Sequence, residues 1–182
     1  MKELIIPKGY KSKLTLMETE QAIKLCKDVF ERELARALNL VRVSAPLFVR
    51  PETGLNDNLN GVERPVKFDI ADIGAEVEIV QSLAKWKRYA LGLYGFAPGT
   101  GLYTDMNAIR RDEELDNLHS VYVDQWDWEL AINASDRTID FLRSVVKKIY
   151  GAIRATSKII SDAYQVLEHQ LPDDIEFITS YE

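Results

Sequence analysis

The sequence contains little cysteine and histidine and has no long apolar run. Its 182 residues include one cysteine, Cys26, and two histidines, His119 and His169. A single cysteine excludes an internal disulfide, and so few thiol and imidazole ligands argue against a zinc site. The apolar run at residues 4–6 is too short for the core of a signal peptide, and no run approaches the roughly 20 residues that span a bilayer. We therefore expect a cytoplasmic protein that holds no metal through its own side chains and does not contact membranes.

Several common motifs are also absent. The chain has no GxxxxGK[ST] phosphate loop, no GxGxxG fingerprint and no GxSxG nucleophile elbow. The glycine-rich segment at residues 95–101, GFAPGTG, has none of these spacings. The formal net charge of −6 argues against general nucleic-acid binding, since that affinity comes from neutralising phosphates. We expect no nucleic-acid partner.

The composition is that of a globular protein, with 46% hydrophobic and 29% charged residues. The length predicts a single domain over residues 1–182. Apolar residues spaced three and four apart predict a long helix over residues 19–40, with Thr19 as its N-cap and Cys26 buried on its apolar stripe. Further helices are predicted over residues 82–93, with Ser82 as the N-cap, and over residues 135–170.

Strands are expected between these helices. They are predicted over residues 41–50, 65–70, 76–80, 102–110, 119–129 and 175–178. Pro46 places the first of them at a sheet edge or at a bulge, because proline donates no ladder hydrogen bond. The order of elements is mixed rather than strictly alternating. We therefore predict an α+β fold, with a mostly antiparallel sheet flanked by long helices.

Polar side chains occupy positions where core residues are expected. Lys87 lies in the middle of an apolar helical stripe, so either it extends outward along its own stem or it meets a buried anion. In the strand at residues 119–129, Gln125 and Asp127 share one face, and Trp126 and Trp128 share the other. We expect the two tryptophans to anchor a helix layer. The opposite face is then either solvated or an open cleft that uses Gln125 and Asp127.

A third polar segment, Arg110-Arg111-Asp112-Glu113, follows a predicted strand. An arginine at the end of a strand can clamp a phosphate with two parallel hydrogen bonds. The alternative is an ordinary charged hairpin loop. Residue patterns alone therefore indicate an acidic α+β protein with a candidate anion-binding cleft.

Three of these segments together resemble one enzyme family. They are SLAKWKR at residues 82–88, GLYTDMNAIRRDEE at 101–114 and LHSVYVDQWDWE at 118–129. The chain resembles the ammonia-dependent aspartate–ammonia ligases, the short asparagine synthetases, whose fold is similar to the catalytic core of class II aminoacyl-tRNA synthetases. The resemblance covers nearly the whole chain. It implies a homodimer formed through residues 19–50.

The resemblance also implies a reaction. In this family ATP activates the side-chain carboxylate of L-aspartate as an aspartyl-adenylate and releases pyrophosphate. Ammonia then displaces AMP to give L-asparagine, and Mg²⁺ accompanies the ATP phosphates.

The site residues that the resemblance implies fall into two groups. Those expected to bind aspartate are Lys87 and Gln125 for its carboxylates, Asp57 and Asp127 for its ammonium group, and Ser82 to complete the pocket. Arg110 is expected to stabilise charge at the α-phosphate, and Glu113 to position the nucleotide. Lys87 and Arg110 are the expected catalytic residues.

The chain also departs from the family pattern. Members are longer, and nothing after Ser161 resembles their third motif, which carries an ATP-binding arginine. The chain therefore resembles the N-terminal portion of the enzyme, with the C-terminal part of the core missing. Gln81 stands where histidine is common, and Arg111 where proline is common. The leading interpretation is a ligase that is incomplete alone; the alternative is a truncated, non-catalytic paralogue that binds an amino acid or a partner.

Overall fold

A computed structural model describes residues 4–57, 59–168 and 170–178. The chain divides into two compact units, which we describe separately. Unit 1 consists of Met1–Lys8 and Val41–Ala131, and unit 2 of Gly9–Leu40 and Ile132–Glu182. The single domain expected from the length stays a prediction.

The larger sheet has the strand order β1-β5-β6. Its strands are β1 (Leu40–Arg42), β5 (Gly101–Ile109) and β6 (Tyr122–Leu130). β5 and β6 are antiparallel, with register from Gly101↔Leu130 to Ile109↔Tyr122. Alternate residues of β5 are buried, so one face of this sheet belongs to the core. The predicted strands at 102–110 and 119–129 are therefore confirmed to within three residues at each end.

A smaller antiparallel sheet has the order β2-β4-β3. It contains β2 (Phe48–Val49), β3 (Lys67–Ile70) and β4 (Ala75–Ile79). The short helix η2 (Ala71–Ile73) joins β3 to β4, and Gly74 follows it with φ of 56°, where glycine is favoured. The prediction of one strand over residues 41–50 is wrong. The chain forms β1 and β2 instead, separated by a segment that contains Pro46, and both are edge strands.

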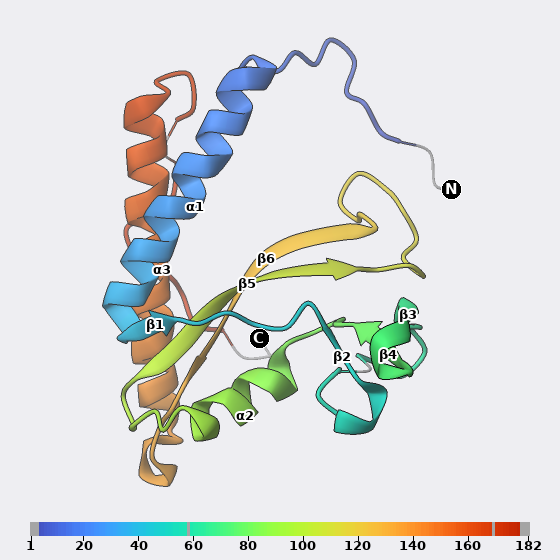
Figure 1. The fold of residues 1–182 in the computed structure, drawn as a ribbon. Helices are drawn as coiled ribbons and strands as arrows, with labels where there is room; N and C mark the ends of the chain where they lie inside the picture. The colour runs from blue at the N-terminus through green and yellow to red at the C-terminus, as the bar shows by residue number, and fades with distance from the viewer. Residues whose placement is uncertain (1–3, 58, 169, 179–182) are drawn as a thin grey trace. The chain divides into compact units, whose positions relative to one another are not determined.

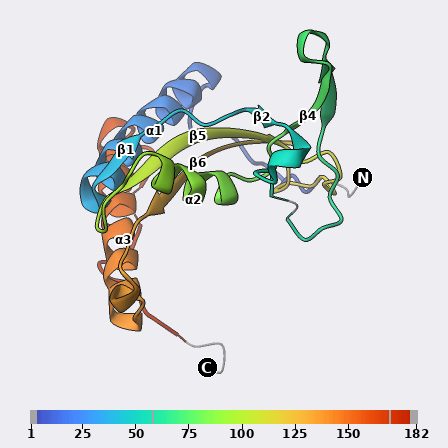
Figure 2. The same cartoon turned by 60° about the horizontal axis from the view of Figure 1, so that its bottom comes forward.

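Helix α2 (Ala84–Leu93) packs against β5 and β6 in unit 1 (Figure 1 and Figure 2). Leu83 and Leu102 are fully buried at 0% exposure, and they form a core cluster with Trp86, Ala90 and Met106. Burying a leucine side chain contributes roughly 1.5–3 kcal/mol. This apolar contact is what holds the helix on the sheet.

Unit 2 is built on two long helices, α1 (Leu16–Leu38) and α3 (Ile139–Ala163), which lie side by side in both views (Figure 1 and Figure 2). α1 begins with a capping box in which the Thr15 hydroxyl accepts from Glu18 N–H and the Glu18 carboxylate accepts from Thr15 N–H. The prediction of Thr19 as the N-cap is therefore wrong by one helical turn. Its hydroxyl donates to the Thr15 carbonyl instead.

Cys26 is exposed, so its predicted burial is also wrong. Ala22, Val29, Leu34 and Leu38 of α1 are buried. A stripe that spans these positions is wider than the face that one neighbouring helix covers. Cys26 therefore shares the stripe without being covered.

The third predicted helix, residues 135–170, is shorter in the structure. α3 starts after its N-cap, Thr138, and ends at Ala163; residue 169 lies outside the described residues. After α3 the chain turns at Tyr164 and residues 172–174 bond to α3. Tyr150 Oη donates to the Pro172 carbonyl at 2.6 Å, and Lys147 pairs with Asp174 at 2.9 Å.

The predicted strand at residues 175–178 is not formed. A strand needs a second strand with which to exchange hydrogen bonds, whereas this segment follows residues that are bonded to a helix. Within the described part of the chain, no helix is both long and apolar enough to cross a membrane.

Candidate functional site

The face of β5–β6 that α2 covers carries most of the residues expected at the site. In the strand register, Gln125 lies opposite Met106 and Asp127 lies opposite Thr104. Met106 and Thr104 are buried on this face. The period of two continues from Ala108 to Arg110, just beyond the end of β5. Arg110, Gln125 and Asp127 therefore share the face on which α2 places Lys87.

This arrangement corrects one expectation and confirms another. We expected Gln125 and Asp127 to face an open cleft or solvent, but α2 covers their face. The reason lies in β5, whose Leu102, Met106 and Ala108 give this face its apolar core. Trp126 and Trp128 lie on the opposite face, as the alternation predicts, but α2 packs on the Gln125–Asp127 face, so the tryptophans do not anchor this helix.

Lys87 is buried, at 6% exposure, and its ammonium group meets an anion. It forms an ion pair with Asp127, donates to the Trp128 carbonyl at 2.9 Å and lies 3.5 Å from Glu129 Oε2. Of the two interpretations of Lys87, the buried-anion one is therefore correct. Buried charges are retained when they are paired in this way.

Glu129 was not among the predicted site residues. The signal was present, since Glu129 continues the alternation of Gln125 and Asp127 along β6. Gln125 itself is half-buried, and its amide donates to the Met106 sulfur at 3.3 Å. A thioether is a weak acceptor, so this contact holds the amide loosely.

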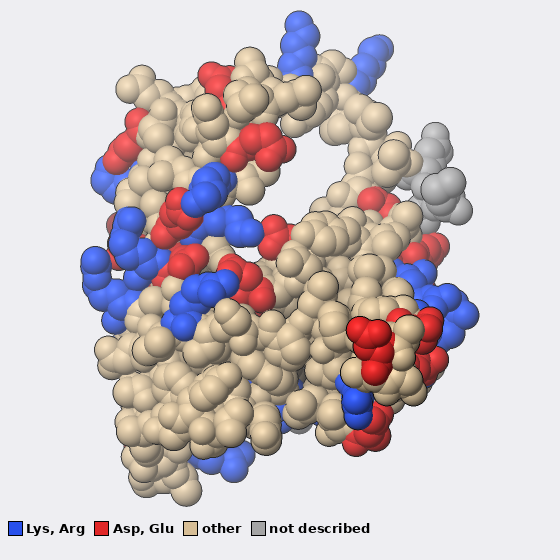
Figure 3. Space-filling view, in the orientation of Figure 1, with Lys and Arg blue, Asp and Glu red and all other residues tan. Residues whose placement is uncertain are grey.

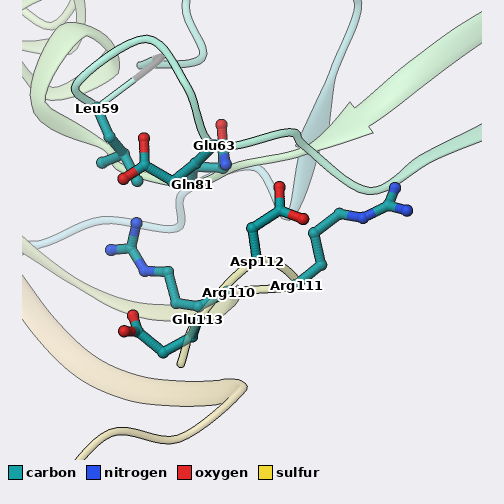
Figure 4. A pocket seen from close by; sticks show the side chains of 7 residues that line it. All are labelled: Leu59, Glu63, Gln81, Arg110, Arg111, Asp112 and Glu113. Carbon is teal, nitrogen blue, oxygen red and sulfur yellow. The ribbon is translucent and has the colours of Figure 1, made fainter. Parts of the chain in front are cut away.

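A cavity of about 290 Å³ lies at the other end of this face. It is lined by Leu59, Glu63, Gln81 and the segment from Arg110 to Glu113. Figure 4 shows Arg110 and Glu113 on one side, with Leu59, Glu63 and Gln81 on the other. The Arg110–Glu113 segment is a turn, closed by a bond of 3.1 Å from Glu113 N–H to the Arg110 carbonyl. The predicted nucleotide residues Arg110 and Glu113 thus meet in one cavity.

The two walls of this cavity are joined by Arg64 and Asp112. The backbone N–H of Arg64 donates to Asp112 Oδ2 at 2.8 Å, and its guanidinium donates to both carboxylate oxygens. The side-chain bond to Arg64, followed by the backbone bond, lowers the pKa of Asp112 to about 2. The Arg111 side chain turns away from Arg110 (Figure 4) and reaches toward the Pro65 carbonyl. Because the Arg111 side chain points away, Arg110 is the arginine of this segment whose guanidinium faces the cavity.

Gln81 forms the buried part of the wall. It is 2% exposed, and its backbone N–H donates to Asn56 Oδ1 at 2.8 Å. This bond brings Asp57 and Ser82, the chain neighbours of Asn56 and Gln81, to the same region. Ser82 Oγ accepts from Ala84 N–H at 3.2 Å, although the N-cap position of α2 is Leu83 rather than Ser82. The structure thus places Asp57 and Ser82 beside the cavity wall.

Charge on the protein surface is mixed. On the face shown in Figure 3, lysine, arginine, aspartate and glutamate side chains alternate rather than forming one patch of a single sign. Many of them pair, such as Lys24 with Asp28 and Lys158 with Asp162, each one helical turn apart. Exposed pairs of this kind contribute little to stability.

Comparison with known proteins identifies the family of this chain. The family model described as aspartate-ammonia ligase matches residues 17–182. The chain is 63% identical to the aspartate–ammonia ligase of Ruminiclostridium cellulolyticum and 59% identical to that of Clostridium perfringens strain 13. These matches cover 100% of this chain and 54% of each relative. The chain spans about half the length of the curated relatives it matches.

A solved structure supports the fold. An ATP phosphoribosyltransferase regulatory subunit/histidyl-tRNA synthetase from Bacillus halodurans is similar with a TM-score of 0.58 at 15% identity, over 84% of this chain and 38% of that chain. The predicted class II synthetase-like α+β fold is therefore confirmed. The match over residues 17–182 and the identities of up to 63% show that the chain belongs to the aspartate–ammonia ligase family.

Proposed function

We propose that this chain forms the aspartate pocket and part of the ATP site of an enzyme that makes L-asparagine from L-aspartate, ammonia and ATP. One observation carries the proposal. Lys87 of α2 forms an ion pair with Asp127 on the face of β5–β6 that α2 covers, and Arg110 directly follows the end of β5. The family resemblance assigns these three residues to one active site.

The ion pair between Lys87 and Asp127 matches the charges of aspartate. An amino acid that enters between them gives its ammonium group to Asp127 and a carboxylate to Lys87. Gln125 exchanges its weak sulfur contact for a substrate oxygen, which is a stronger acceptor. By resemblance, Asp57 adds a second acceptor for the ammonium group, and Ser82 closes the pocket.

The cavity around Arg110 takes the nucleotide in this proposal. A substrate carboxylate oxygen attacks the α-phosphorus, and pyrophosphate leaves. Arg110 stabilises the negative charge that develops there, and Glu113 positions the nucleotide. The nitrogen of ammonia then bonds to the activated carbonyl carbon and loses one proton to solvent, and AMP leaves with the electrons of the broken C–O bond.

Mg²⁺ accompanies ATP in the proposed reaction and neutralises phosphate charge. Among the described residues there is no group of three or more histidine, cysteine, aspartate or glutamate side chains that could hold a metal ion. Mg²⁺ usually binds through one or two carboxylates together with substrate phosphates. Glu113 is the carboxylate of this cavity that fits such a role.

The proposed assembly is a cytoplasmic homodimer formed through residues 19–50. The exposed apolar side chains Met17 and Ile23 of α1, with the nearby Cys26, support an interface on this helix. The proposal includes no nucleic-acid or membrane partner.

The test is AMP and asparagine formation from aspartate, Mg²⁺-ATP and ammonium, together with aspartate binding by calorimetry. Equal amounts of AMP and asparagine, lost in Arg110→Ala, support a ligase that works without further chain. Aspartate binding without AMP supports the alternative, an amino-acid-binding module. Absence of both from folded protein contradicts the aspartate pocket.

A further inference from the structure

Two buried oxygen atoms on the cavity wall accept no hydrogen bond from the part of the chain that the structure describes. They are Glu63 Oε2 and Gln81 Oε1. Both residues line the cavity that also holds Arg110 and Glu113 (Figure 4). A buried acceptor without a donor destabilises the fold, so two on one wall indicate a ligand that supplies donors.

The neighbouring hydrogen bonds keep this wall in place. Asn56 accepts from Gln81 N–H and donates to Glu78 Oε2 at 3.1 Å and to the Ile79 carbonyl at 3.3 Å. Arg64, the residue after Glu63, is held by Asp112. The backbone segments that carry the two acceptors are therefore anchored.

The ligand chemistry follows from the atoms. Phosphate and carboxylate oxygens are themselves acceptors, so they do not satisfy Glu63 Oε2 or Gln81 Oε1. A small cation with several N–H groups satisfies both, because a carboxylate supplies the charge and an amide oxygen a second acceptor. Ammonium has this chemistry, and its four N–H bonds point in different directions.

We propose that Glu63 and Gln81 form the subsite that receives ammonium, on the cavity wall opposite Arg110 and Glu113. The inference rests on the proposed function, in which ammonia is the second substrate. Gln81 stands where the family resemblance leads us to expect histidine. The proposal gives this residue a role in binding the nitrogen source.

The test that does not require turnover is an NMR titration of the whole chain. The Gln81 side-chain amide signal, identified by its loss in Gln81→Leu, is followed as ammonium chloride is added. Tetramethylammonium chloride at equal ionic strength is the comparison, because it has the charge but no N–H donors. We expect a saturating shift with ammonium only, weakened about tenfold or more in Glu63→Gln.

The matched control is Glu52→Gln, which changes an exposed carboxylate in the preceding helix η1 (Pro51–Thr53) and should leave the titration unchanged. A shift that fails to saturate, or that tetramethylammonium reproduces, overturns the subsite. A shift of the Gln81 signal that AMP causes and ammonium does not also overturns the subsite. That result would assign the two oxygen atoms to nucleotide binding. The remaining NMR signals report whether each variant is folded.

A kinetic arm separates this inference from the proposed function. Aspartate-dependent exchange of pyrophosphate into ATP needs no ammonia, so its absence in the unaltered chain contradicts the proposed function alone. Where turnover is present, the KM for ammonium should rise in Gln81→Leu by more than the KM for ATP. Equal changes in the two values overturn the subsite.

Discussion

Lys87 and Asp127 form an ion pair with each other on the face of β5–β6 that α2 covers. The family resemblance assigns them to opposite charges of one substrate. In the structure each supplies the counter-charge that keeps the other stable in a largely buried place. Under the proposed function, aspartate binding exchanges this one ion pair for two, between Lys87 and a substrate carboxylate and between Asp127 and the substrate ammonium group.

Removing Lys87 should destabilise the fold. Lys87→Ala leaves the Asp127 carboxylate, which is 19% exposed, without its main partner. Breaking a buried pair costs roughly 3–5 kcal/mol, and the partial exposure of Asp127 places the expected loss near the lower end. Urea unfolding measures it. Arg88→Ala is the control. Arg88 is 72% exposed and its Nε lies as far as 3.8 Å from Glu129 Oε1, so this substitution should lower the unfolding free energy by less than about 1 kcal/mol. Equal losses would contradict the buried pair.

The same lysine should govern aspartate affinity. At a temperature where Lys87→Ala is folded, calorimetry should detect no aspartate binding, since the substrate carboxylate has lost its cation. Asp127→Asn should weaken binding by about tenfold or more, because a charged hydrogen bond is replaced by a neutral one. Arg88→Ala should bind as the unaltered chain does. Unchanged affinity in Lys87→Ala would rule out this pocket.

Asp112 should titrate abnormally because of Arg64. Its pKa of about 2 lies below the ordinary value of about 3.9. The folded state therefore gains stability from this carboxylate above about pH 4 and loses the gain as the pH falls toward 2. In Arg64→Ala the pKa of Asp112 should rise toward 3.9 in a carboxyl NMR titration. Asp116, whose low pKa comes first from the Leu118 backbone N–H, should keep its value in the same spectra.

The true cap of α1 can be located by substitution. Thr15→Ala removes the capping-box hydroxyl and should cost about 1 kcal/mol of unfolding free energy. Thr19→Ala should cost less, because the Thr19 hydroxyl bonds only to the Thr15 carbonyl within the first turn. The two midpoints of urea unfolding give the comparison. A larger loss of unfolding free energy in Thr19→Ala than in Thr15→Ala would identify Thr19 as the N-cap, as the sequence pattern predicts.

Cys26 provides a probe of the proposed dimer. Its exposure in the single chain predicts reaction with a thiol reagent under native conditions. If residues 19–50 form the interface, the rate should fall as the protein concentration rises and dimers bury the thiol. A rate that does not depend on concentration, in a sample shown to be dimeric by sedimentation, would place the interface elsewhere.

Strong local patterns predicted the elements well. The alternation in residues 102–110 and 119–129 identified β5 and β6, because each strand's own period of two marks its buried face. The polar residues Lys87, Gln125 and Asp127 marked the candidate site, because they interrupt apolar patterns. By contrast, one predicted strand became β1 and β2, and α1 began a turn before the expected cap.

The sequence by itself determined the family and most residues of the candidate site, because short motifs carry residue types at set spacings. Tertiary structure alone decided which side chains form pairs with one another. Lys87 meets Asp127 because α2 docks on the face where β5 supplies Leu102 and Met106. Glu63 and Gln81 reach one cavity because Asn56 and Arg64 anchor their segments, 18 residues apart in the chain, through hydrogen bonds. Such contacts depend on packing between distant segments, which no local pattern records.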